Sequence, residues 1–445
     1  MTAARLTEIQ LHAFKSYKGE RLPLDAVTVL TGRNSSGKSN ALDAIEVLSR
    51  LAGGEDLADA LDGRRRTGGP VRGGSAGCAP HGMNRFRLGC LVAQGQDVYR
   101  FSVTVQVRPE LRILQESLWG PGPALESGYI EDRPLLWSRP VKKDSTGLVA
   151  EVFNGKRGNN PTMQFRDSRL LVTQLPLRFV ATSLADEAVL KGAQAVIGAL
   201  RAVFHFDPVP HFMRDYVPAR NAELTRNGDN ISAAIARLRR EDPDTFTELE
   251  ELVRNVADDG IKSVTVTSSD LGDVMLALRE GTKRGDLTPA REMSDGLLRF
   301  MAIATALLTS NKGLDIDSGL VLNKLPVTVL MVIEELENGL HPSQAGRVLE
   351  LIQQTSQESG TSMLVTTHSP ALLNAMTGQL NRSIFVCFRD PKSRASKISR
   401  ITDLPGYAGT IASGRIGDLV SLGRLTEPQS RTPDDDAFDR LLGIS

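Results

Sequence analysis

The stretch that most constrains this chain is a phosphate-loop pattern near its start. Residues 32–39 read Gly-Arg-Asn-Ser-Ser-Gly-Lys-Ser and match the pattern G-x-x-x-x-G-K-[ST]. Residues 26–30 before it are apolar and mostly β-branched, whereas residues 40–48 repeat apolar side chains at helical spacing. The sequence therefore predicts a strand, a phosphate-binding loop and a helix in succession.

A loop of this kind binds phosphate through its backbone. Glycines let N–H groups converge on the β- and γ-phosphates at a helix N-terminus, whose partial positive charge favours anions. Lys38 is expected to reach the β- and γ-phosphate oxygens, and Ser39 to ligate Mg²⁺. The alternative is a flexible glycine loop without a ligand. The predicted nucleotide-binding residues are Gly32, Arg33, Asn34, Ser35, Ser36, Gly37, Lys38, Ser39 and Asn40.

Composition limits the classes of partner. The chain has 445 residues, which allow two to four domains, and its 53 basic residues balance 53 acidic ones. No global field therefore favours nucleic acid or an anionic membrane, and any contact with DNA must be local. The three cysteines are far apart and lack metal-ligand spacing, as expected of free thiols in a reducing cytosol. No apolar run approaches the roughly 20 residues of a membrane span, so we expect a cytoplasmic protein with no membrane association.

A second motif, Ser294-Asp295-Gly296, precedes an apolar helix that continues to about residue 308. Ser294 and Asp295 are favoured N-caps, so free backbone N–H groups and a hydroxyl would point outward at a positive helix end. Taken alone, this motif is equally consistent with an ordinary capped core helix. With the phosphate loop, it adds a second candidate contact for the nucleotide.

Two further segments predict buried strands that end in polar residues. Residues 327–333 are continuously apolar, as in a strand buried on both faces, and lead into Glu334 and Glu335. Two carboxylates there suit one acid associated with Mg²⁺ and one that positions or deprotonates the attacking water. Residues 363–367 predict another strand that ends at His368, whose imidazole could bond a terminal phosphate oxygen. The alternative for the two acids is a solvated pair without a ligand, and His368 taken alone would more often be a structural residue.

In this order, the motifs resemble the ATP-binding-cassette (ABC-type) ATPase heads of the RecF, SMC and OLD-like families, and most closely the OLD/RecF-like "AAA-type" ATPases. The match covers about residues 1–50 and 220–375. Leu336 stands where the family usually has proline, and Glu334 where other heads have aspartate. The residues that carry the resemblance are Phe14-Lys15-Ser16, Lys38-Ser39-Asn40, Ser294-Asp295-Gly296, Ile333-Glu334-Glu335 and Glu337-Asn338-Gly339-Leu340-His341-Pro342.

The resemblance implies an ATPase with ATP and Mg²⁺ as cofactors. In such heads the signature of one subunit completes the site at the phosphate loop of another, so Ser294 and Gly296 would contact the γ-phosphate in trans. Glu334 would support the metal, Glu335 would be the base and His368 would sense the γ-phosphate. The implied assembly is a homodimer or higher homo-oligomer, closed by two shared nucleotides.

For the biological role, the resemblance implies bacterial phage defence or DNA maintenance, with control of a partner effector such as a nuclease. One alternative is a RecF-like DNA-binding repair ATPase without an effector. Another is the ATPase subunit of a transporter, against which the lack of a membrane span and the Phe14-Lys15-Ser16 start argue. OLD nucleases carry a nuclease domain after the head, but only 77 residues follow His368 (445 − 368). We therefore expect the nuclease, where there is one, on a separate polypeptide.

The expected fold class is α/β: an ABC-ATPase head, with a P-loop NTPase core sheet, a flanking antiparallel sheet and a short inserted α+β lobe. Residues 85–118 alternate polar and apolar side chains and predict strands of the flanking sheet. Residues 182–203 and 229–256 have the pattern of amphipathic helices. A Gly- and Arg-rich stretch at 51–84, densest at 63–69 and 72–74, is either a flexible basic loop that contacts phosphates or a solvated linker. The expected domains are 1–118 and 216–445 for the two parts of the head, and 119–215 for the inserted lobe.

Overall fold

The computed structural model describes most of the chain. The described residues are 2–63, 69–123, 132–141, 147–156, 158–256, 260–280, 286–310, 312–316, 326–338, 345–376, 378–404, 407 and 416–421. Some residues of the sequence motifs lie outside this part, namely 64–68 of the Gly- and Arg-rich stretch and 339–342 of the segment after Glu337.

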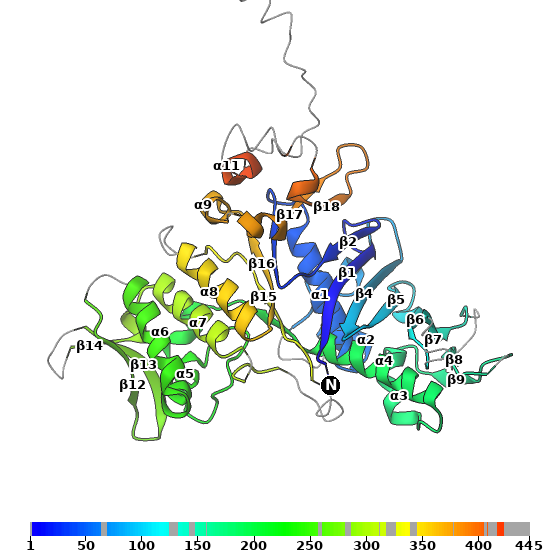
Figure 1. Ribbon diagram of the computed structural model, residues 1–445, viewed down its shortest axis with the longest axis horizontal. Helices are drawn as coiled ribbons and strands as arrows, with labels where there is room; N and C mark the ends of the chain where they lie inside the picture. The colour runs from blue at the N-terminus through cyan, green and yellow to red at the C-terminus, as the bar shows by residue number, and fades with distance from the viewer. Residues whose placement is uncertain are drawn as a thin grey trace, which may run out of the picture.

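A six-stranded sheet forms the centre of the molecule (Figure 1). Five of its strands are parallel, and β18 pairs with β17 in the antiparallel sense. The strands are continuously apolar because both faces of the sheet are covered. In spatial order they are β10 (Val203–Phe206), β15 (Leu330–Ile333), β16 (Ser362–Thr367), β3 (Val27–Thr31), β17 (Ile384–Arg389) and β18 (Ser396–Arg400).

An eight-stranded antiparallel sheet forms the lobe at the right of Figure 1. Its strands alternate buried and exposed residues, because one face packs on the core and the other does not. In spatial order they are β2 (Glu20–Pro23), β1 (Ala4–Ala13), β4 (Arg85–Gln94), β5 (Asp97–Gln106), β6 (Arg112–Pro121), β7 (Asp132–Ser138), β8 (Leu148–Val152) and β9 (Thr162–Phe165).

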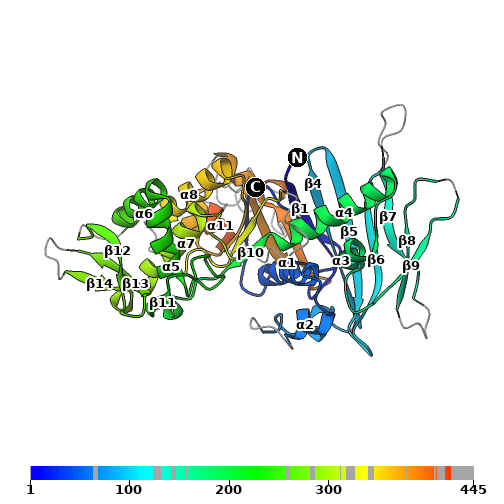
Figure 2. The same cartoon turned by 90° about the horizontal axis from the view of Figure 1, so that it is seen from below.

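Helices fill the space between the two sheets. The phosphate-loop helix α1 (Lys38–Ala52) contacts both β1 and β10, and α4 (Leu184–Arg201) crosses β1, β4, β5, β6 and β7, as Figure 2 shows from below. The Ser183 hydroxyl accepts the Asp186 N–H and so begins α4. Two shorter helices, α2 (Leu57–Asp62) and α3 (Leu171–Arg178), complete this layer. One apolar core therefore joins the antiparallel sheet to the phosphate-loop helix.

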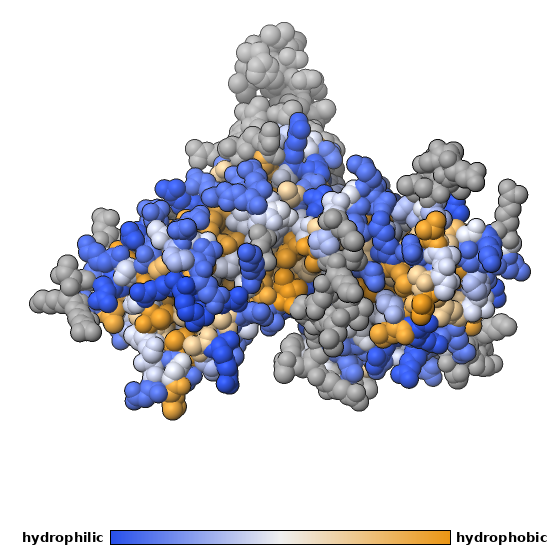
Figure 3. Space-filling model, turned by 60° about the horizontal axis from the view of Figure 1, so that its bottom comes forward, coloured by the Kyte–Doolittle hydropathy of each residue, from blue (hydrophilic) through white to orange (hydrophobic). Residues whose placement is uncertain are grey.

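A second lobe lies on the other side of the parallel sheet and has its own core. It contains a four-stranded sheet of β11 (Val217–Pro218), β13 (Asp273–Arg279), β12 (Ser263–Ser268) and β14 (Leu287–Pro289). Figure 3 shows hydrophobic side chains gathered between the two lobes on one face of the molecule. The helices of this side are α5 (Ile231–Glu241), α6 (Pro243–Val256), α7 (Asp295–Leu308), α8 (Ala345–Glu358), α9 (Pro370–Ala375) and α11 (Ile416–Ser421).

Short 3₁₀ turns link several of these elements: η1 (Ala76–Cys78), η2 (Pro210–Arg214), η3 (Ala290–Glu292), η5 (Gly378–Ser383) and η6 (Ile401–Asp403). The turns η2 and η3 lie at the two ends of the second lobe's small sheet in the chain. The turn η2 leads into β11, and η3 leads into α7.

The expected α/β fold class, with a parallel core sheet and a flanking antiparallel sheet, is confirmed. The boundaries of the lobes differ from the expected ones. Strands β7, β8 and β9 lie in the segment 119–215 and extend the antiparallel sheet, because each pairs with the strand before it. The additional small sheet with α5 and α6 instead lies between β10 and α7 in the chain.

Candidate functional site

Three of the segments singled out in the sequence end at one edge of the parallel sheet: Gly32 follows β3, Glu334 follows β15 and His368 follows β16. Asp207, to which the sequence gave no role, follows β10 at the same edge. Because these strands are parallel and adjacent, their carboxyl ends meet at the same edge, where open α/β sheets bind ligands. The edge therefore collects residues from four separate parts of the chain.

Backbone geometry explains the residues of the phosphate loop. Gly32 and Gly37 have φ angles of 143° and 121°, which glycine tolerates and other residues rarely adopt. A Cβ atom at Gly32 would collide with the carbonyl oxygen of Cys387, and one at Gly37 with the Ser396 hydroxyl. The loop is thus closely packed against β17 and β18, which no local sequence pattern indicates.

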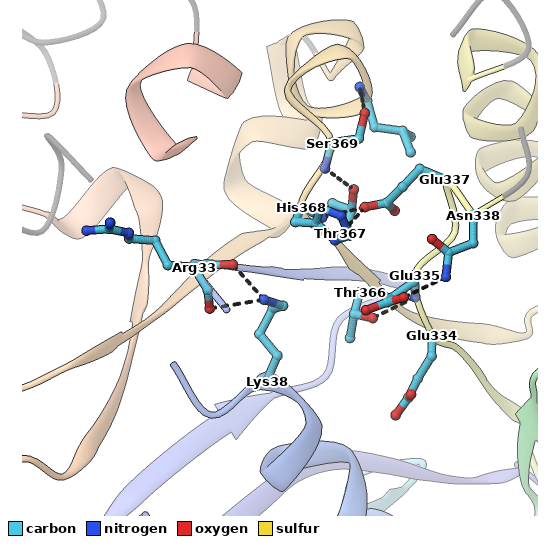
Figure 4. Close-up of polar contacts among 12 residues, drawn as sticks. Arg33, Lys38, Glu334, Glu335, Glu337, Asn338, Thr366, Thr367, His368 and Ser369 are labelled. Atoms are coloured by element: carbon cyan, nitrogen blue, oxygen red, sulfur yellow. Dashed lines mark hydrogen bonds and ion pairs between the residues drawn. The ribbon is translucent and has the colours of Figure 1, made fainter. Parts of the chain in front are cut away.

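Lys38 lies on the first residue of α1 and folds back over the loop. Its Nζ donates to the carbonyl oxygens of Gly32 (2.6 Å) and Arg33 (3.3 Å), as Figure 4 shows. Burial lowers the pKa of Lys38, while the nearby negative charges of Glu335 and Glu337 act in the opposite direction. Phosphate oxygens of a bound nucleotide could therefore replace the two carbonyl oxygens as hydrogen-bond acceptors of the Lys38 ammonium.

The loop is also held by side chains of distant segments. The Ser396 hydroxyl donates to the Ser36 carbonyl (2.6 Å) and lies 2.8 Å from the Ser16 hydroxyl. Asn40, which was predicted to contact nucleotide, donates from its amide to the same Ser16 hydroxyl (2.7 Å). On the other side, Tyr17 donates to the Gly37 carbonyl (2.9 Å). The Phe14-Lys15-Ser16 segment is thus part of the phosphate-loop support.

Two pockets open beside the loop. The first, of about 390 Å³, is lined by Thr31, Gly32, Arg33, Asn34, His368 and Val420. The second, of about 590 Å³, lies by the first turn of α1, and its lining includes the basic residues Lys15, Lys18, His81, Arg108, Arg389 and Arg394 without any carboxylate. The first pocket therefore borders the loop itself, and the basic lining of the second suits an anionic ligand.

The two acids after β15 have different environments. Burial raises the pKa of Glu334, and Arg72, whose guanidinium is 3.7 Å from its carboxylate, partly offsets this effect. Glu335 is exposed, has a φ of 46° and accepts a hydrogen bond from the Asn338 amide (2.5 Å). Its backbone N–H donates to the Thr366 hydroxyl (2.9 Å), which fixes the turn to the neighbouring strand. Glu335 is therefore the more accessible of the two carboxylates, since Glu334 is half-buried.

His368 is paired with Glu337, a residue that the sequence analysis gave no role of its own. The backbone N–H of His368 donates to Glu337 Oε1 (2.7 Å), and the ring Nδ1 lies 3.0 Å from the same oxygen. Figure 4 shows this pair above Lys38 and beside Glu335. The side chain of Glu337 is only 15% exposed, whereas that of His368 is 48% exposed and contributes to the smaller pocket.

The expected cap at Ser294 is present. Its hydroxyl accepts the N–H of Leu297 (3.3 Å) at the start of α7, and Asp295 is exposed. Arg214 holds the preceding turn by donating to the carbonyls of Ala290 (3.0 Å) and Met293 (2.9 Å). Within the described part of the chain, no hydrogen bond or ion pair joins residues 294–296 to residues 32–39.

One further cluster went unnoticed in the sequence. Lys15, with a φ of 49°, donates to the Asp43 carboxylate (2.7 Å) and to the Arg72 carbonyl (2.7 Å). Arg72, from the Gly- and Arg-rich stretch, thereby comes between the phosphate-loop helix and Glu334. The only local signal for this cluster was the basic composition of that stretch.

Among the residues that the structure describes, no helix is long and apolar enough to cross a membrane.

The model of the family described as "AAA domain, putative AbiEii toxin, Type IV TA system" matches residues 27–374. The chain belongs to this family. A search of curated proteins found no match.

Solved head domains of SMC proteins are similar to this AAA-domain protein in overall structure. An SMC head bound to the C-winged helix domain of ScpA has 15% sequence identity and a TM-score of 0.47, covering 89% of this chain and 97% of that one. The SMC head from Thermotoga maritima has 13% identity and a TM-score of 0.40, covering 89% and 98%. An SMC head with an extended coiled coil from Pyrococcus furiosus, bound to the C-terminal domain of ScpA, has 13% identity and a TM-score of 0.43, covering 92% and 100%.

Proposed function

We propose that this AAA-domain protein binds and hydrolyses ATP at the edge of its parallel sheet. The observation that carries the proposal is that Glu335 and His368, after the ends of β15 and β16, lie beside Lys38, which begins the helix after the phosphate loop of the neighbouring strand β3. Lys38 would hold the β- and γ-phosphate oxygens, and His368 lines the pocket next to the loop. Glu335 is the exposed carboxylate and would take the proton of the attacking water.

Mg²⁺ would be held by Ser39 and Glu334. Ser39 is half-buried in the first turn of α1, and Glu334 is the carboxylate that Arg72 faces. Oxygen ligands of this kind suit Mg²⁺, which keeps several waters and needs few protein groups. When bound, Mg²⁺ would neutralise part of the phosphate charge. The side chains of Ser39 and Glu334 would hold the ion in place.

We further propose that two or more copies close around shared nucleotides. In support, the start of α7 is exposed and makes no contact with the phosphate loop of its own chain within the described residues. Ser294, Asp295 and Gly296 would then bind the nucleotide of a neighbouring copy through the free N–H groups of the α7 N-terminus. Cytoplasmic localisation belongs to the same proposal.

The biological role we propose is control of a partner effector, such as a nuclease, in bacterial phage defence or DNA maintenance. The family description names a toxin of a toxin–antitoxin system, which supports membership of a system with more than one component. A RecF-like repair ATPase that binds DNA is the second candidate, supported by the basic residues at the larger pocket. Binding to DNA that weakens steeply with salt would favour the second candidate.

The deciding experiment compares purified wild-type protein with Lys38→Ala for ATP binding and phosphate release. The wild type should bind and hydrolyse ATP, whereas Lys38→Ala should lose binding or turnover while staying folded. Lys191→Ala is the matched control, since Lys191 pairs with Asp97 on the antiparallel lobe. Unchanged turnover in Lys38→Ala would refute the proposed site.

A further inference from the structure

Glu337 touches His368 twice through a single carboxylate oxygen. The backbone N–H of His368 is 2.7 Å from Oε1, and the ring nitrogen Nδ1 is 3.0 Å from it. A carboxylate oxygen can only accept a hydrogen bond, so a ring nitrogen at this ion-pair distance is stabilised when Nδ1 carries a proton. Between the two neutral forms of the imidazole, the contact therefore favours the one protonated on Nδ1.

The turn that carries Glu337 is fixed on both sides. Leu336 is fully buried, and its N–H donates to the Thr366 carbonyl (3.1 Å). The Asn338 N–H donates back to the Glu335 carbonyl (2.9 Å), which closes the turn. Because β15 and β16 are adjacent, these bonds tie the turn to the strand that ends next to His368. Glu337 is thus held in place before any ligand binds.

We propose that Glu337 is a positioning residue, which holds the His368 imidazole in the Nδ1–H form with Nε2 left to face the phosphate-loop pocket. The proposal rests on the proposed function, because the pocket lined by His368 is the one assigned to ATP phosphates. With Nδ1 engaged, Nε2 is the ring nitrogen left to bond a ligand there. A bond from the ring to an anionic phosphate oxygen then requires a proton on Nε2 as well.

The first test measures the tautomer in nucleotide-free protein. Long-range ¹H–¹⁵N NMR spectra distinguish the two neutral imidazole forms, and the chain has only six histidines. The His368 signals are assigned by their loss in His368→Gln. We expect the neutral ring to carry its proton on Nδ1. A wild-type ring protonated on Nε2 alone would overturn the proposal without any variant of Glu337.

The second test uses two substitutions of Glu337. In Glu337→Gln the amide oxygen can still accept from Nδ1, so the tautomer should be kept although the charge is lost. In Glu337→Ala no acceptor is left, and the ring should move toward the Nε2–H form. Glu350→Gln on α8 is the control, since Glu350 is exposed and its partner among the described residues is Arg347 on the same helix. An unchanged tautomer in Glu337→Ala would overturn the proposal.

Kinetics supply a separate readout. Glu337→Ala should lower kcat by roughly tenfold or more, as loss of a partner that orients a histidine commonly does, with a smaller loss in Glu337→Gln. Equal losses in the two variants would assign the effect to charge and contradict a positioning role. Failure of the wild type to bind ATP would refute the proposed function but leave the tautomer measurement intact, so the two failures are distinguishable.

Discussion

The guanidinium of Arg299 on α7 donates a hydrogen bond to the backbone carbonyl of Glu334, which follows β15 (3.1 Å). The same side chain donates to the carbonyl of Pro208, after β10 (3.2 Å). One buried arginine thus links the helix that begins at Ser294 to the turn that carries the two acids. Burial lowers the pKa of Arg299, although nearby carboxylates oppose this effect.

We predict that Arg299→Lys slows ATP hydrolysis while ATP binding is kept. A lysine ammonium cannot span the carbonyls that the planar guanidinium joins, so the Glu335 turn would lose its tie to α7. Arg299→Ala should in addition lower the free energy of unfolding by about 1–3 kcal/mol, because buried carbonyls lose their donor. Nucleotide affinity, phosphate release and chemical denaturation measure these effects, with Arg240→Lys, an exposed arginine on α5, as control.

We predict that Glu335→Gln binds ATP but hydrolyses it roughly 10²- to 10⁴-fold more slowly, the usual loss for a general base. The amide can still bond Asn338 but cannot take a proton from water. Closed assemblies with ATP should accumulate, and size-exclusion chromatography with and without ATP would reveal them. Turnover at the wild-type rate would show that Glu335 is not the base.

A mixing experiment tests whether sites are shared between copies. Lys38→Ala and Ser294→Arg are each expected to be inactive, but a mixed dimer contains one intact phosphate loop facing one intact Ser294 segment. We therefore expect partial recovery of ATP turnover on mixing. Both variants must first be shown to be folded, because Ser294 caps α7 and its loss costs about 0.5–2 kcal/mol. Mixed dimers that form and stay inactive would contradict sharing in trans.

A buried glutamate makes the stability depend on pH. Both carboxylate oxygens of Glu116 accept backbone N–H groups at the start of α3, from Leu171 and Val172, at 2.8 Å each. Complete burial nevertheless raises the pKa of Glu116 to about 8 from its ordinary 4.5. The folded state therefore holds this proton more tightly than the unfolded state, and the associated stability is lost as the pH rises from about 4.5 to about 8.

We predict that Glu116→Gln removes this part of the pH dependence. Between pH 5 and 8 the free energy of unfolding of the wild type should fall relative to that of the variant, by up to about 1.4 kcal/mol per pH unit. Urea denaturation at several pH values measures the difference. Glu110→Gln, an exposed position before β6, is the control and should keep the wild-type slope. Parallel slopes for wild type and Glu116→Gln would show that Glu116 stays ionised in the fold.

The sequence by itself determined the local parts of this protein. Residues 32–39 specify the phosphate loop because its glycines are needed for left-handed backbone angles, and Ser294 marks the start of α7 because its hydroxyl caps the helix. The continuous apolar runs before Glu334 and His368 likewise predicted buried strands from a local pattern. Each of these features depends on residues within about one turn or one strand.

Only the tertiary structure decided which of these parts meet. The order β10, β15, β16, β3 and β17 in the sheet brings Glu337 to His368, and the fold of the Gly- and Arg-rich stretch brings Arg72 to Glu334. It likewise extended the antiparallel sheet through β7, β8 and β9, where the sequence predicted a separate lobe. These contacts join residues that are far apart in the chain, and strand order depends on packing of whole faces, which no local pattern of side chains records.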